Sequence, residues 1–166
     1  MKKAHCSLML LASMLASTIV HAQLKGFGIG PYAESAWPSG SLSNTHNRGI
    51  GVGIGADLNL PARLGLTGSV GYMHFGGKSI STSDGSSKAE AINAVPVRAG
   101  VKYRLPGIYF KLESGIAKLT NDQPAPIIVA PGVGIRLLGL DVQGKFESWI
   151  KKDTWSFWGV KASYQF

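Results

Sequence analysis

A strict two-residue alternation constrains this chain more than any other feature of its sequence. Residues 49–60 read GIGVGIGADLNL, so that glycine or a polar residue alternates with an aliphatic residue. A period of two is the period of a β-strand, whose successive side chains point to opposite faces. Glycine is a poor strand former, because it loses much backbone entropy and packs no side chain. The stretch therefore predicts a strand with one apolar face and one nearly bare face.

The same alternation recurs along the chain, and no stretch after the first segment repeats apolar residues at helical spacing. The alternating windows are residues 27–35, 49–60, 64–75, 95–105, 108–119, 127–138, 140–150 and 155–166. Each is roughly the 9 to 11 residues that a tilted strand needs to cross a membrane. Long connections (36–48, 76–94, 120–126, 151–154) alternate with tight ones such as Pro106-Gly107. This pattern is typical of outer-membrane proteins, so we expect an all-β, eight-stranded antiparallel transmembrane β-barrel with periplasmic termini.

The composition of the two faces indicates which one points outward. The apolar face carries a single charge, Lys118, and an Arg or Lys at mid-bilayer would cost roughly 2–4 kcal/mol. The other face combines glycines with charges of both signs. These charges are Arg98, Lys102, Arg104, Lys111, Arg136, Lys145 and Lys161, against Glu34, Asp57, Glu113, Asp141 and Glu147. Because eight strands enclose only enough room for side chains to fill, we expect a packed polar interior and a lipid-facing apolar surface. A soluble barrel, with its apolar face inside, is the alternative.

Aromatic residues favour the membrane barrel, because they gather near the two ends of the windows, where interfacial girdles lie. The set near the long loops is Trp37, Tyr72, Trp149, Trp155 and Trp158. The set near the short turns is Tyr103, Tyr109, Phe110, Tyr164 and Phe166.

The first segment has the form of a secretory signal, with Lys2 and Lys3 before an apolar run of about 13 residues, too short to cross a bilayer. We expect a signal peptide at 1–22 and a barrel domain at 23–166. The single cysteine, Cys6, lies in the signal, so the mature chain has no thiol chemistry. Removal of both lysines lowers the formal net charge from +8 to +6. The remaining cations are scattered, which argues against nucleic acid as a partner.

The chain ends in an apolar alternation that finishes on an aromatic residue: Trp158, Val160, Tyr164 and Phe166. This ending resembles the C-terminal signal of bacterial outer-membrane proteins. The resemblance implies recognition by the barrel-assembly machinery during biogenesis.

Residues 93–117, NAVPVRAGVKYRLPGIYFKLESGIA, resemble the small porin-family or "outer membrane protein beta-barrel domain" proteins common in Bacteroidetes. The likeness is carried by Pro96, Val97, Gly100, Lys102 and Tyr103. It implies an eight-stranded barrel in the OmpX or OmpA-barrel style over the whole mature chain. It does not imply a wide pore, since aqueous pores appear at about 16 strands.

Candidate chemistry is sparse. Two histidines, His46 and His74, follow the signal, and both are expected near the long-loop rim among Ser, Thr and Asn. Some eight-stranded barrels, of the lipid A acyltransferase and deacylase kind, act on outer-leaflet lipid with His and Ser near this rim. His46 and His74 are therefore the catalytic candidates if the chain is an enzyme, although no spacing singles out a nucleophile and a base. His74 also has the parity of the lipid face. Two isolated histidines predict no metal site, and we expect no cofactor.

One interior cluster follows from the Pro106-Gly107 turn. A two-residue turn sets Lys102 opposite Lys111 and leaves Glu113 diagonal to Lys102 and within reach of Arg98. We therefore predict an ion-pair cluster of Arg98, Lys102, Lys111 and Glu113, centred on Glu113, with a structural role.

Together these features predict a monomeric outer-membrane barrel with a structural or surface-interaction role, in contact with outer-membrane lipid and lipopolysaccharide. A lipid-modifying enzyme is the alternative, followed by a narrow channel.

Overall fold

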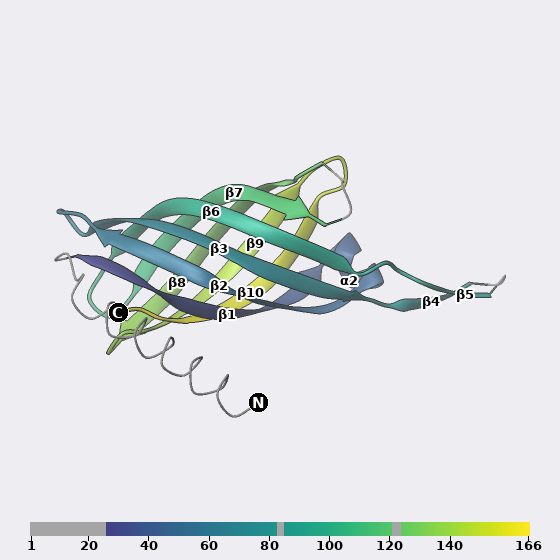
Figure 1. Cartoon of the computed structure of the whole chain (residues 1–166), viewed down its shortest axis with the longest axis horizontal. Helices are drawn as coiled ribbons and strands as arrows, with labels where there is room; N and C mark the ends of the chain where they lie inside the picture. The colour runs from purple at the N-terminus through teal and green to yellow at the C-terminus, as the bar shows by residue number, and fades with distance from the viewer. Residues whose placement is uncertain (1–25, 83–84, 121–123) are drawn as a thin grey trace, which may run out of the picture.

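The computed structural model describes residues 26–82, 85–120 and 124–166, and within it eight strands close into one antiparallel barrel (Figure 1). Their order around the barrel is β1-β10-β9-β8-β7-β6-β3-β2. The strands are β1 (Phe27–Ser39), β2 (His46–Asn59), β3 (Leu64–Gly77), β6 (Ile92–Arg104), β7 (Tyr109–Leu119), β8 (Ile127–Leu137), β9 (Leu140–Ile150) and β10 (Trp155–Tyr164). Each contains most of one alternating window, which confirms the predicted eight-stranded barrel. The predicted signal peptide, residues 1–22, lies outside the described residues.

The long connections contain more regular structure than the sequence indicated. A five-residue helix, α2 (Ser41–Thr45), lies between β1 and β2, and both strands extend into the expected loop. Between β3 and β6, strands β4 (Ser79–Thr82) and β5 (Gly85–Lys88) form a separate two-stranded sheet. Figure 1 shows this hairpin projecting beyond the barrel. In the described part of the chain, no helix is long and apolar enough to span a membrane.

Tight turns connect the strands at the opposite end. Leu105 donates its backbone N–H to the carbonyl of Ile108 at 2.8 Å, and Gly107 has a φ of 83°. Leu138 and Gly139 both have positive φ, as a two-residue hairpin turn of type I′ requires. The predicted register is confirmed, because Lys102 pairs with Lys111 and Gly100 with Glu113. The first residues of β1 and the C-terminal residue lie at this short-turn end (Figure 1).

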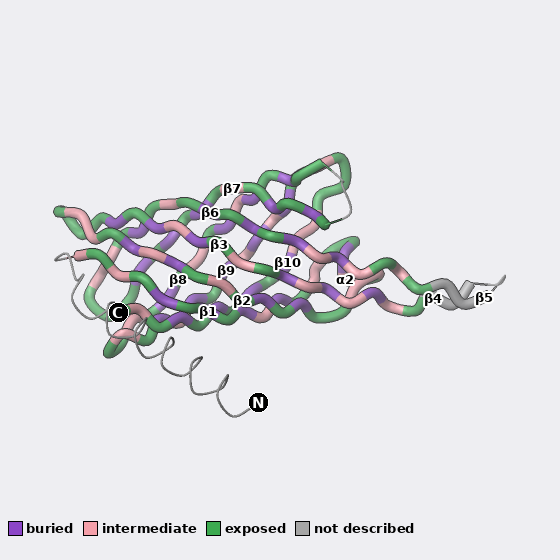
Figure 2. The backbone as a smooth tube through the Cα atoms, in the orientation of Figure 1, coloured by how far each residue is buried: buried purple, intermediate pink, exposed green. Residues whose placement is uncertain are grey.

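Buried and exposed residues alternate along the strands, and the apolar face points outward (Figure 2). On β2, Ile50 and Val52 are 62% and 60% exposed, whereas Gly49, Gly51 and Asp57 are buried on the lumenal face. A soluble barrel would bury its apolar face, so this arrangement contradicts the soluble alternative. Lys118 lies on the outer face at the long-loop end of β7, as its parity predicted.

Two aromatic residues assigned to the outer girdles point inward instead. Trp149 is 1% exposed and Tyr109 is 3% exposed. The reason is strand parity: Trp149 lies on the face of β9 that carries Lys145 and Glu147, and Tyr109 lies on the face of β7 that carries Lys111. The other members of the predicted bands lie on the outer face, except Trp155, which packs against interior side chains.

The interior is polar only toward the short turns and in the middle, which corrects the expectation of a polar lumen throughout. At the long-loop end the inward side chains form an apolar plug. Its members are Ala36, Leu42, Met73, Phe75, Ile92, Ala94, Ala117, Leu119, Ile128, Ala130, Trp149 and Phe157. Phe75, Trp149 and Phe157 pack their rings at centroid distances of 5.2 to 6.1 Å. Leu42 of α2 belongs to this plug, so the short helix caps the barrel.

Candidate functional site in the barrel lumen

The middle of the lumen holds a neutral network of four fully buried charges. The Arg98 guanidinium contacts Glu34 at 3.1 Å and Glu147 at 2.8 Å. The Lys145 ammonium contacts the same two carboxylates at 2.7 and 2.6 Å. Trp149 adds a hydrogen bond from its indole Nε1 to Glu147 at 2.6 Å. We call Glu34, Arg98, Lys145 and Glu147 the central network. Its two positive and two negative charges compensate each other, as buried ions require.

A second neutral set lies closer to the short turns. Lys102 pairs with Asp57 and, at 3.5 Å, with Asp141. Arg136 contacts Asp57 at 2.6 Å and Asp141 at 3.0 Å. The Tyr109 hydroxyl donates to Asp141. We call Asp57, Lys102, Arg136 and Asp141 the lower network. Arg136 is its most accessible member, with a side chain that is 31% exposed.

The structure divides the cluster that the sequence predicted around Glu113. Glu113 keeps only Lys111, at 3.7 Å, and accepts a hydrogen bond from Thr67 at 3.4 Å. Arg98 belongs to the central network and Lys102 to the lower one. The prediction considered the β6–β7 pair alone, but long inward side chains cross the lumen to carboxylates on β1, β2 and β9. Glu34, Asp57 and Glu147 were recognised as inward charges, yet no spacing in the sequence indicates which cation each one meets.

The lumenal glycines make room for these long side chains. A Cβ on Gly51 would lie 2.9 Å from Cγ of Glu34, and one on Gly53 would lie 2.6 Å from the Tyr32 ring. A Cβ on Gly159 would lie 3.0 Å from the Lys145 side chain. Gly49, Gly51 and Gly53 therefore reflect crowding inside the barrel, whereas a Cβ on Gly55 would come no closer than 3.7 Å to the atoms around it.

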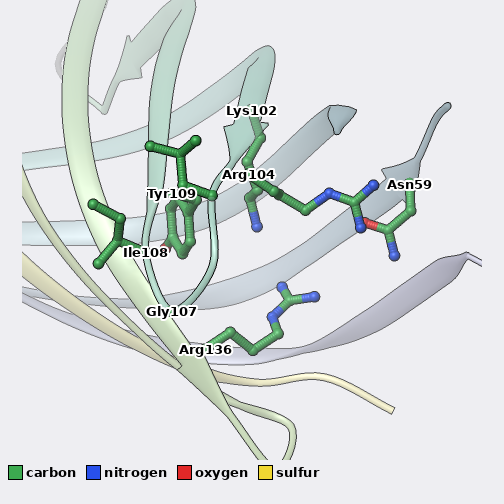
Figure 3. A pocket seen from close by; sticks show the side chains of 8 residues that line it. Asn59, Lys102, Arg104, Gly107, Ile108, Tyr109 and Arg136 are labelled. Carbon is green, nitrogen blue, oxygen red and sulfur yellow. The ribbon is translucent and has the colours of Figure 1, made fainter. Parts of the chain in front are cut away.

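A pocket of about 230 Å³ opens into the lumen at the short-turn end (Figure 3). In Figure 3 the side chains of Lys102, Arg104 and Arg136 surround one space, with Asn59 beside the Arg104 guanidinium. Tyr109 closes another side. The pocket therefore lies directly below the lower network and is lined mainly by hydrogen-bond donors.

The two candidate histidines lie at the long-loop end and have separate partners. Nδ1 of His46 lies 2.8 Å from the Thr45 hydroxyl, and its Nε2 lies 2.9 Å from the carbonyl of Glu90. Nδ1 of His74 lies 2.7 Å from Oδ1 of Asn93. In the described residues no three or more His, Cys, Asp or Glu side chains gather as a metal site would require.

The residues of the predicted C-terminal signal share the outer face. Trp158, Val160, Tyr164 and Phe166 are all exposed, and the Tyr164 and Phe166 rings pack at a centroid distance of 4.9 Å. They form an apolar strip down the lipid-facing side of the last strand and the residues after it. Their role as an assembly signal stays a prediction.

No protein-family model matches the sequence, and comparison with curated proteins gives no match. Solved structures do match. A de novo designed transmembrane β-barrel aligns with a TM-score of 0.54 at 15% identity, over 84% of this chain and 95% of the design. Ail, the attachment invasion locus protein of Yersinia pestis, aligns in its complex with the heparin analogue sucrose octasulfate with a TM-score of 0.52 at 14% identity. That alignment covers 85% of this chain and 97% of Ail. Ail in a phospholipid nanodisc gives 0.51 at 13% identity, over 86% of this chain and all of Ail. The chain thus has the fold of small eight-stranded outer-membrane β-barrels.

Proposed function

We propose that this chain is an integral protein of the bacterial outer membrane that makes surface contacts through its long-loop end. The supporting observation is the filled lumen. Two charge networks occupy its lower and middle parts, and the apolar plug closes the long-loop end, at the opposite end from the pocket near the short turns. Eight-stranded barrels enclose little more than their own side chains, so this lumen does not form a wide aqueous channel. Conductance in planar bilayers tests this point, and we expect no steady current.

By sequence, the long-loop end carries six cations against four carboxylates, with Asp84 and Asp122 included, and this modest positive excess suits an anionic partner. Its described cations are Arg48, Lys78, Lys88, Lys118, Lys151 and Lys152, and its described carboxylates are Glu90 and Asp153. Arg48 lies over the Trp37 ring at 4.9 Å, and Lys151 lies over Trp155 at 3.7 Å. Arg48 lies beside the outward-facing ring of Trp37, where it would meet the phosphates of lipopolysaccharide in the outer leaflet. Ail, of similar fold, has been solved with a polysulfated sugar.

Native mass spectrometry of the folded barrel in detergent tests this contact with added lipid A. We expect lipid A to bind, and to bind less well after removal of its phosphates. Replacing Arg48 and Lys118 together by Gln should weaken binding. Arg63→Gln is the control, because it removes one exposed cation at the short-turn end. Equal binding of intact and dephosphorylated lipid A would contradict an anionic contact.

A lipid-modifying enzyme is the second candidate, and one observation favours it. Oδ1 of Asn93 accepts hydrogen bonds from the Tyr72 hydroxyl and from Nδ1 of His74, at 2.8 and 2.7 Å. A His74 that donates from Nδ1 to Asn93 would have Nε2 as its free nitrogen, which is the atom that a general base would use. Mass spectrometry of host lipid A with and without the protein is the test, with His74→Ala and His46→Ala as variants. We expect unchanged lipid A.

One further partner and the oligomeric state are also proposals. The outer apolar strip of Trp158, Val160, Tyr164 and Phe166 is proposed as the segment that the barrel-assembly machinery reads. Phe166→Ser should slow assembly in cells while leaving refolding in detergent unchanged. The closed hydrogen-bonded barrel has no free strand edge, which supports a monomer.

A further inference from the structure

The pocket at the short-turn end is surrounded by more positive than negative charge (Figure 3). Three cations line it: Lys102, Arg104 and Arg136. The carboxylates behind them, Asp57 and Asp141, are shared between Lys102 and Arg136. The lower network is neutral, so the charge of Arg104 is additional.

Arg104 is held by neutral groups. Its Nη2 donates to the backbone carbonyls of Leu60 and Leu64 at 3.1 and 3.2 Å. In the described part of the chain it makes no ion pair with a carboxylate, and its buried Nε–H has no acceptor. The Nε atom itself has almost no accessible surface, so a ligand would reach Arg104 through the part of its side chain that lines the pocket. A bound anion there would supply the missing negative charge.

We propose that this pocket binds a phosphate group. Arginine guanidinium groups present planar sets of donors that match phosphate oxygens, and Arg104 and Arg136 extend into the same space from different strands. Asn59 adds an amide beside Arg104 (Figure 3). The pocket's volume of about 230 Å³ is well above the roughly 10–15 Å³ of cavity that one water molecule needs, so a phosphate fits.

The phosphate has two possible sources at this end of the barrel. It can be a free phosphate on the periplasmic side, or the headgroup of an anionic phospholipid in the adjacent leaflet. Both present the same oxygens to Arg104. The site lies at the opposite end from the proposed surface contacts, so neither proposal depends on the other.

NMR of the folded barrel in maltoside micelles, which contain no phosphate, tests the site directly. Inorganic phosphate is titrated at constant ionic strength, with chloride as the reference, while the Arg104 Nε–H and Asn59 amide signals are followed. We expect both signals to shift saturably with phosphate only. A second titration uses phosphatidylglycerol added to the micelles. A saturable shift with this lipid alone identifies the headgroup as the source, and one with free phosphate alone identifies the soluble anion.

Arg104→Gln should weaken binding about tenfold or more, since it removes a charge-assisted hydrogen bond. Arg63→Gln, which removes an exposed cation at the same end that does not line the pocket, should change affinity less than about twofold. Electrophoretic mobility with and without heating confirms that each variant is folded. If Arg104→Gln does not fold, the wild-type titrations decide alone. Shifts that stay linear with both ligands, or an equal loss in the folded Arg63→Gln variant, would overturn the proposal.

Discussion

The two parts of the lumen are filled by different physical means. In the central network, four charges and the Trp149 indole meet at distances between 2.6 and 3.1 Å, with side chains that are at most 1% exposed. In the apolar plug, toward the long loops, aromatic and aliphatic side chains pack against one another, and Trp149 joins the two parts through its hydrogen bond to Glu147. The first part depends on charge matching and the second on shape.

This difference has consequences for what each part tolerates. A buried ion pair contributes little over an apolar packing of the same shape, yet removing one partner leaves an uncompensated charge. Truncating an apolar side chain of the plug leaves a cavity, whose cost depends on how far the neighbouring side chains relax. We therefore expect a substitution in the central network to lower the free energy of unfolding more than a substitution in the apolar plug.

Glu147→Gln should have the largest effect, lowering the free energy of unfolding by about 3–5 kcal/mol. Glu147 accepts from Arg98, Lys145 and Trp149, so its removal leaves two cations facing one carboxylate, Glu34. Urea unfolding in lipid vesicles measures the change. Glu113→Gln is the matched control, because this side chain is also fully buried but has one cation, Lys111, at 3.7 Å. Equal costs at the two positions would contradict the importance of the central network.

Ile128→Ala tests the plug and should cost about 2–5 kcal/mol, because Ile128 is fully buried against Trp149 and its neighbours. Ile127→Ala is its control on the same strand. Ile127 is 55% exposed toward lipid, which can fill the space that the removed atoms leave. A cost at Ile127 as large as at Ile128 would show that lipid contact, rather than the plug, stabilises this end.

The sequence predicted the part of this comparison that depends on strand parity. Alternation identified the eight strands, the outward apolar face and the inward charges, because a period of two fixes the face of every residue. It also fixed the register at Pro106-Gly107. The same parity rule places Trp149 and Tyr109 inside. The aromatic girdles were predicted from position along the strand alone, and the prediction is wrong for these two residues because their parity points them inward.

The pairing of charges and the plug were beyond the sequence for a different reason. Which carboxylate Arg98 reaches depends on the barrel's closure, which brings β1 and β9 across the lumen from β6. The apolar plug was also hard to predict because some of its members, such as Ala94 and Ala117, are small. Small residues occur on both faces of these strands, so they do not mark the inward face as apolar. Strands β4 and β5 pair with each other and not with the barrel. Their polar sequence has no apolar alternation, so it resembled a loop.

Gly53→Ala tests how tightly the polar part of the lumen is packed, because it adds a methyl group there. The new Cβ would meet the backbone of Val70 and Gly71 on the neighbouring strand first and the Tyr32 ring at 2.6 Å, so we expect a cost of about 1–3 kcal/mol. Gly68→Ala is the control, because its Cβ would come no closer than 3.8 Å to another residue. The same unfolding assay compares them. If both substitutions are neutral, the lumen is less crowded than the glycine pattern indicates.

Arg136→Gln should have the smallest effect, about 1 kcal/mol or less. Its guanidinium is partly in solvent, and Asp57 and Asp141 both keep Lys102 when it is removed. Solvent access also makes this contribution sensitive to salt, since the Debye length falls to ~3 Å at ~1 M. The difference between wild type and Arg136→Gln should therefore shrink at high salt, while the Glu147→Gln difference should not, because the central network is sealed from water. If salt reduced both differences alike, ions would be reaching the middle of the lumen, and the plug and networks would not fill it.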